Sequence, residues 1–129
     1  MFSPIFLGLE EVLEIHHDQI KRYGGTAGIR DLDLLQSSLA MPQTGAGNQY
    51  FHADLFEMAA AYLFHIVRNH PFVDGNKRTG VAAALVFLEM DGIEIRASDE
   101  ALVKTVLDVA AGRLQKGTLA EFFRRHART

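Results

Sequence analysis

The two most apolar segments of this chain are joined by His70-Pro71-Phe72-Val73-Asp74-Gly75-Asn76-Lys77-Arg78-Thr79-Gly80. In the segment before it, apolar residues recur at helical spacing and predict an amphipathic helix that ends at His70 (Phe56, Ala59, Leu63, Ile66 and Val67). In the segment after it, residues 81–88 are apolar without a break, which is typical of a helix buried on every side. The pattern predicts an all-α bundle around a central buried helix at about 76–90, with a charged loop between the ends of two core helices.

Positive charge falls at an unusual place in this stretch. Gly75 and Asn76 suit a turn followed by a helix cap, so Lys77 and Arg78 are predicted to be the first helical residues. A helix start carries partial positive charge, and two cations there cost about 0.3–1 kcal/mol each. The conflict disappears if an anion binds there, because backbone N–H groups, the helix dipole and both side chains would converge on it. We therefore predict a phosphate site formed by Gly75, Asn76, Lys77 and Arg78.

Two further residues of the stretch suit phosphate chemistry. Asp74 can bind Mg²⁺, which commonly takes one or two carboxylates plus substrate phosphates. His70 can act as a general base near neutral pH. A lone histidine at a helix end is usually structural, and Asp-Gly-Asn alone is an ordinary turn. The nine residues from His70 to Arg78 nevertheless contain a base, an acid and two cations. This combination favours a catalytic site for phosphate transfer to a hydroxyl, and Phe72 is expected to be an apolar anchor for the loop.

Histidine and arginine residues near this stretch leave alternatives open. Arg68, two residues before His70, either reaches a phosphate or is solvated. His16 and His17 are adjacent, and neighbouring helical side chains point about 100° apart. They are therefore not predicted to share a metal ion, and one of them is expected to pack against the core. Arg30 is expected to pin its loop through a local ion pair with Asp31 rather than to take part in chemistry.

The pattern His-x-Phe-x-Asp-Gly-Asn-Lys-Arg-Thr resembles the signature of Fic/Doc proteins, specifically the death-on-curing (Doc) toxin branch. The Gly-Gly-x-x-Gly-Ile-Arg-Asp run at residues 24–31, followed by Leu-Leu-Gln-Ser-Ser-Leu-Ala, also looks Doc-like. The common Fic pattern has a glycine where this chain has Lys77 and a second arginine where it has Val81. Both departures are those of the Doc branch, and they argue against adenylyl transfer.

This resemblance implies a toxin of a toxin–antitoxin module that transfers the γ-phosphate of ATP, with Mg²⁺, to a threonine of elongation factor Tu and so inhibits translation. It also implies an antitoxin that docks a helix into a groove on the toxin. The inhibitory Ser/Thr-x-x-x-Glu-Gly/Asn helix of self-inhibited Fic proteins is not present, since no glutamate here precedes glycine or asparagine. The alternatives are a Fic-type AMP or nucleotidyl transferase and, from another class, a catalytically silent helical binding module.

Bulk properties narrow the class of protein. At 129 residues the chain is expected to form a single domain, 1–129. A net charge of −3 argues against direct nucleic-acid binding. The chain has no cysteine, which excludes a disulfide framework. The N-terminus does not resemble a signal peptide, and no apolar run approaches the roughly 20 residues that cross a bilayer. We expect a soluble, cytoplasmic protein with no membrane partner.

Further helices are predicted at 9–23, at about 32–40 with Asp31 as cap, from Asp54, from Ser98, and from a capping box at Thr118-Leu-Ala-Glu121. These give six or seven helices in total. Residues 93–96 alternate like a short extended segment. Residues 41–53 contain one proline and two glycines and predict a mobile loop. The resemblance implies that this loop is a flap over the active site, the alternative being an ordinary surface loop.

Overall fold

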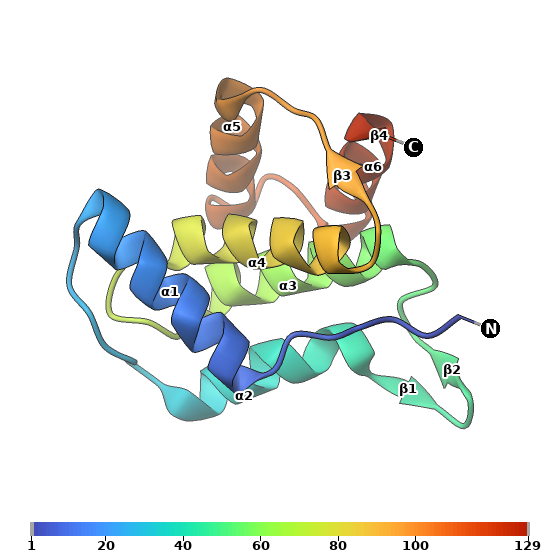
Figure 1. Ribbon diagram of the computed structural model, residues 1–129, viewed down its shortest axis with the longest axis horizontal. Coiled ribbons are helices and arrows are strands. Elements are labelled where there is room, and N and C mark those ends of the chain that lie inside the picture. The colour runs from blue at the N-terminus through green and yellow to red at the C-terminus, as the bar shows by residue number, and fades with distance from the viewer. Residues whose placement is uncertain (1, 129) are drawn as a thin grey trace.

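The computed structural model describes residues 2–128, and this part of the chain is an all-α fold (Figure 1). Its six α-helices are α1 (Leu9–Tyr23), α2 (Leu32–Ala40), α3 (Leu55–Asn69), α4 (Asn76–Met90), α5 (Asp99–Ala110) and α6 (Lys116–His126). A 3₁₀ turn, Met41–Gln43, follows α2. Four two-residue strands form two small antiparallel sheets: β1 (Gly45–Ala46) with β2 (Gln49–Tyr50), and β3 (Glu94–Ile95) with β4 (Ala127–Arg128). The predicted fold class is confirmed.

Helices α3 and α4 pack side by side at the centre, and α3 also contacts α2, α5 and α6 (Figure 1). Gly80 of α4 allows this close approach. A Cβ atom at Gly80 would lie 2.8 Å from Cγ2 of Val67 and 3.3 Å from the carbonyl oxygen of Leu63, both on α3. The short loop of residues 70–75 that joins the two helices is therefore fixed at both ends by core packing.

Capping patterns in the sequence predicted most helix starts correctly. The carboxylates of Asp31 and Asp54 accept hydrogen bonds from the N–H groups of Leu34 and Glu57, and the hydroxyl of Ser98 accepts one from Ala101. The predicted start of α6 at Thr118 was wrong. That helix begins at Lys116, without a side-chain cap, and Glu121 of the expected capping box is paired with Arg124 instead.

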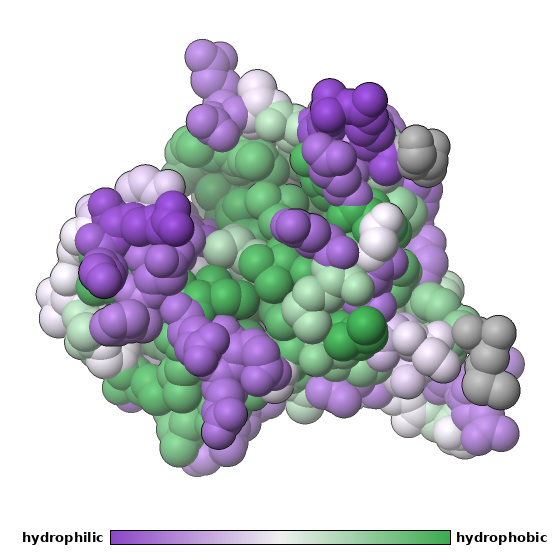
Figure 2. All heavy atoms as spheres, viewed as in Figure 1, coloured by the Kyte–Doolittle hydropathy of each residue, from purple (hydrophilic) through white to green (hydrophobic). Residues whose placement is uncertain are grey.

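The expectation that α4 is buried on every side was also wrong. Ala83, Ala84, Phe87 and Leu88 are buried, but a second face, formed by Val81, Ala82, Leu85 and Val86, is only partly covered. Figure 2 shows hydrophobic residues gathered in the hollow between α1 and α5, where α4 passes beneath. Helix α3 is the more enclosed of the two central helices, because it packs against α2, α4, α5 and α6.

The predicted mobile loop at 41–53 contains the hairpin β1–β2, which lies at the N-terminal end of α3 (Figure 1). His70 lies at the opposite end of that helix, about 22 Å away along 15 residues. The hairpin therefore does not cover the charged loop, and its assignment as a flap is corrected. Within residues 2–128, none of the helices combines the length and apolar character needed to cross a membrane.

Candidate functional site

His70 ends α3 in an unusual backbone conformation. It has φ 53° and ψ 52°, in the left-handed region, and it is the one residue other than glycine with positive φ among residues 2–128. Glycine is the common residue at such a helix end, because a Cβ atom is crowded there. The backbone of His70 is therefore strained, and its side chain is exposed. Backbone strain of this kind is common at functional sites.

The segment Gly24–Asp31 lies along the charged loop and is bonded to it almost residue by residue. Thr26 N–H donates to Asp74 Oδ2 at 3.1 Å, and Val73 N–H donates to the carbonyl of Gly28 at 3.0 Å. Ile29 and Phe72 form an antiparallel bridge. This segment, rather than the 41–53 loop, borders the site.

Glycines make this contact possible. Gly24, Gly25 and Gly28 all have positive φ. A Cβ atom at Gly25 would lie 2.8 Å from Asp74 Oδ2. The three glycines of the run at 24–31 were the sequence signal for this segment, although they did not indicate what it contacts.

Asp74 is exposed, and its carboxylate is held by the backbone. Its two oxygens accept hydrogen bonds from the N–H groups of Thr26, at 3.1 Å, and Gly75, at 2.8 Å. These two bonds, Thr26 first, hold the pKa of Asp74 below its usual value, with a smaller contribution from the charge of Arg78. A carboxylate offers about four acceptor positions, so this charged group keeps free oxygen lone pairs. It fits Mg²⁺, which prefers hard oxygen ligands.

Buried side chains shape the loop from inside. The amide of Asn76 accepts from the N–H of Phe72 at 2.9 Å and donates to its carbonyl at 3.0 Å. Asn76 is 3% exposed and Phe72 is fully buried, which confirms Phe72 as the apolar anchor. Sequence reasoning treated Asn76 as a cap and phosphate ligand. Its side chain is in fact engaged with the backbone of Phe72, so only its N–H group is available to an anion.

The N-terminus of α4 is open. Gly75 is the N-cap, in the left-handed conformation, and supplies no side-chain cap. The first backbone bond of the helix joins Thr79 N–H to Gly75 C=O. Within residues 2–128, the N–H groups of Asn76, Lys77 and Arg78 consequently have no protein acceptor. Such uncapped N–H groups form an anion-binding position.

The two cations at this helix start differ in their surroundings. Lys77 is exposed and Arg78 is half-buried. The guanidinium of Arg78 donates from Nη2 to the carbonyl of Gly24 at 2.9 Å and lies over the ring of Tyr23, 5.7 Å from its centroid. Arg78 thus connects α4 to the end of α1, with donors left for a ligand.

Two predicted relationships are not seen. Arg68 donates from Nη1 to the carbonyls of Val109 and Ala110, at 3.4 and 3.2 Å, and so binds the C-terminal end of α5 rather than the charged loop. The expected Arg30–Asp31 ion pair does not form in the described part of the chain. Arg30 instead bonds to the end of α3, and Asp31 caps α2. Among residues 2–128, the side chains of His70 and Asp74 are not hydrogen-bonded to each other, and Asp74 accepts from backbone N–H groups.

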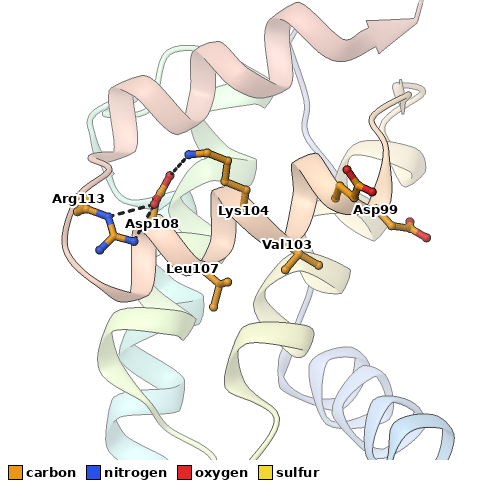
Figure 3. A pocket seen from close by; sticks show the side chains of 7 residues that line it. Asp99, Val103, Lys104, Leu107, Asp108 and Arg113 are labelled. Atoms are coloured by element: carbon orange, nitrogen blue, oxygen red, sulfur yellow. Dashed lines mark hydrogen bonds and ion pairs between the residues drawn. The ribbon is translucent and has the colours of Figure 1, made fainter.

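A groove of about 550 Å³ begins at Lys77 and Arg78 and runs between α1, α4 and α5. Its apolar lining includes Val81, Ala82 and Leu85 of α4. It also includes Val103 and Leu107 of α5, which are 54% and 46% exposed. Figure 3 shows Val103 and Leu107 pointing to the same side of α5, next to the Lys104–Asp108–Arg113 ion pairs. Exposed apolar side chains of α5 thus line the same groove as Lys77 and Arg78 of α4.

A separate polar cluster lies at the start of α6, apart from this loop. Lys116 Nζ is 3.0 Å from Nε2 of His65 and 3.4 Å from Nε2 of His52. Burial, followed by the charge of Lys116, lowers the pKa of His65 to about 4 and also lowers the pKa of His52. The contacts of Lys116 tie α3 and the segment before it to α6.

Comparison with known proteins places these observations in context. A model of the Fic/DOC family matches residues 6–88. "Protein kinase doc" of Escherichia phage P1 is 34% identical over 116 residues, which cover 90% of each chain. "Toxin Doc" of Mycolicibacterium smegmatis is 41% identical over 75 residues, which cover 58% of each chain. The family match includes both Gly24–Asp31 and the whole charged loop.

Proposed function

This chain belongs to the Fic/DOC family, and from that premise we propose that it is the toxin of a toxin–antitoxin module, transferring the γ-phosphate of ATP to a protein hydroxyl. The relatives named as a kinase and as a toxin support both parts of this proposal. The proposed acceptor is a threonine of elongation factor Tu, and the proposed consequence is inhibition of translation.

One observation carries the proposal: α4 begins without a side-chain cap, and two cations stand beside three N–H groups that have no acceptor among residues 2–128. A helix that only had to be stable would place a Ser, Thr or Asp cap here and acids in the first turn. The first turn of α4 contains no acid. Phosphate oxygens bound at this position would accept from the N–H groups and neutralise Lys77 and Arg78.

In the proposed reaction His70 takes the proton of the target hydroxyl. The hydroxyl oxygen forms a bond to the γ-phosphorus while the bond to the bridging oxygen of ADP breaks. Lys77, Arg78 and the N–H groups of α4 hold the phosphate oxygens in line, and such positioning provides most of the catalysis in phosphoryl transfer. Mg²⁺ held by Asp74 would neutralise charge on the phosphates.

The two departures from the common Fic pattern favour transfer of phosphate over transfer of AMP. Lys77 stands where that pattern has glycine, and Val81 stands where it has a second arginine. Lys77 lies in the first turn of α4, and its side chain lines the groove. A bulky cation there restricts how a diphosphate can lie, so adenylyl transfer is the second candidate.

We propose that the groove from Lys77 to Leu107 takes a helix of the antitoxin. An amphipathic helix can bury its apolar face on exposed side chains such as Val103 and Leu107. Because the groove is continuous with the cations of α4, its occupant would also restrict access to the phosphate site. This arrangement supplies a reason for the open face of α4.

The activity is tested with purified elongation factor Tu, ATP and Mg²⁺, followed by mass spectrometry of its threonine peptides. We expect a phosphorylated threonine with the unaltered chain and none with His70→Ala. His17→Ala, which replaces an exposed histidine on α1, is the matched control and should retain activity. An unmodified factor, or full activity in His70→Ala, would overturn the proposed acceptor or the proposed base.

A further inference from the structure

Arg30 lies 40 residues before His70 in the sequence but contacts its backbone directly. The guanidinium donates from Nε to the carbonyl of His70 at 2.6 Å and from Nη2 to the carbonyl of Asn69 at 2.9 Å. The N–H of Arg30 donates to the carbonyl of Pro71 at 2.7 Å. Three successive carbonyl oxygens around the proposed base therefore accept hydrogen bonds from one residue.

These bonds satisfy carbonyl groups at the C-terminal end of α3. The last carbonyls of an α-helix have no partner within the helix and carry partial negative charge. A guanidinium fork can satisfy two neighbouring acceptors and complement that charge, whereas a lysine offers only a point charge. Arg30 binds the His70 carbonyl while the backbone of His70 is in the left-handed conformation.

From this geometry we infer that Arg30 is a positioning residue for His70: it holds the left-handed conformation and thereby fixes the direction in which the imidazole leaves the backbone. The inference rests on the proposed function, in which His70 is the base. Without Arg30 the end of α3 can relax to a less strained conformation, and the ring would swing away from the target hydroxyl. Misplacement by about 1 Å can lower a rate by roughly 10²-fold.

The test compares Arg30→Ala, Arg30→Lys and the control Arg22→Ala, which removes an exposed arginine that pairs with Asp18 on the same helix. The readouts are kcat and KM for ATP, together with the ¹³Cα and ¹³Cβ chemical shifts of His70, which report its backbone angles. We expect Arg30→Ala to lower kcat roughly 10- to 100-fold with KM nearly unchanged, and to move the His70 shifts. Arg30→Lys should show a smaller loss, and Arg22→Ala no change.

A double variant separates positioning from an independent role. Arg30→Ala should not further lower the slow residual rate of His70→Ala, measured over long incubations, because both substitutions act through the same imidazole. Equal losses in the two backgrounds, or unchanged His70 shifts in Arg30→Ala, would overturn the inference. Full activity in His70→Ala would instead refute the proposed function, and the His70 shifts would still decide whether Arg30 fixes that backbone.

Discussion

The imidazole of His16 stacks on the ring of Phe72, with centroids 3.8 Å apart and planes 5° from parallel. Nε2 of His16 also lies 2.9 Å from the carbonyl oxygen of Asp74. A buried histidine on α1 thus holds both the apolar anchor of the charged loop and the backbone of the proposed Mg²⁺ ligand. The sequence predicted that one histidine of the pair would pack against the core, and this is confirmed: His16 is 5% exposed.

His16→Ala is expected to lower the free energy of unfolding by about 1–3 kcal/mol, because it removes a buried aromatic contact and a hydrogen bond. It should also lower kinase activity, since Asp74 loses a backbone support. Urea denaturation measures the first effect and phosphorylation rates the second. His17→Ala is the control and should stay within about 0.5 kcal/mol of the unaltered chain. Equal effects of the two substitutions would show that the stack does not stabilise the loop.

Gly80→Ala is expected to destabilise the protein by about 1–3 kcal/mol through overpacking. The added methyl would meet Val67 and the carbonyl of Leu63, so α3 and α4 would have to separate. Gly117→Ala is the matched control in α6, where a Cβ atom meets nothing within 4 Å. A helical glycine with free space gains up to about 1 kcal/mol on conversion to alanine. Thermal unfolding of both variants checks the prediction, and a neutral Gly80→Ala would contradict close helix packing there.

Val103→Asp combined with Leu107→Asp is expected to abolish binding of the cognate antitoxin while leaving phosphorylation within about twofold. Both side chains are exposed on α5, so their replacement costs little stability. Titration calorimetry with the product of an adjacent small reading frame measures the binding. Phe51→Asp, which replaces an exposed aromatic residue near the hairpin, is the control. Undiminished binding by the double variant would place the antitoxin elsewhere.

Stability is expected to fall as the pH drops from about 6.5 toward 4, in part through His65. Its pKa is lowered on folding to about 4, so the unfolded chain binds more protons in this range and acid favours unfolding. Burial is the main cause of the lowered pKa of His65 and His52, and Lys116→Met removes the positive charge that is the second cause. The dependence of thermal stability on pH should become shallower in Lys116→Met and stay unchanged in Lys21→Met. If thermal stability depends on pH equally steeply in both variants, the charge of Lys116 does not affect the pKa of His65.

Local signals explain what could be predicted from sequence. Asp31, Asp54 and Ser98 accept hydrogen bonds from N–H groups three residues further along the chain. Their roles as helix caps can therefore be predicted from a short stretch of sequence. The charged loop was identified for the same reason, since its polar residues lie within nine positions. The start of α6 was missed because Glu121 satisfies a local capping pattern but pairs with Arg124.

Contacts between distant parts of the chain explain what could not be predicted. Arg30 and His16 lie 40 and 58 residues from the atoms they contact in the charged loop. Nothing in their own neighbourhoods indicates those partners. Arg68 lies two residues from His70 but projects to α5, because positions two apart lie on roughly opposite sides of a helix. Proximity in sequence was therefore a poor guide to membership of the site.

We propose that the start of α4 binds ATP so that its γ-phosphate reaches a hydroxyl beside His70. Incubation of a bacterial lysate with the purified chain and ATP labelled separately at the α or the γ position tests this most directly. We predict protein labelling from γ-labelled ATP only, lost in His70→Ala and retained in His17→Ala. Label from the α position would indicate transfer of AMP, and absence of label from both positions, or labelling that survives His70→Ala, would contradict the account.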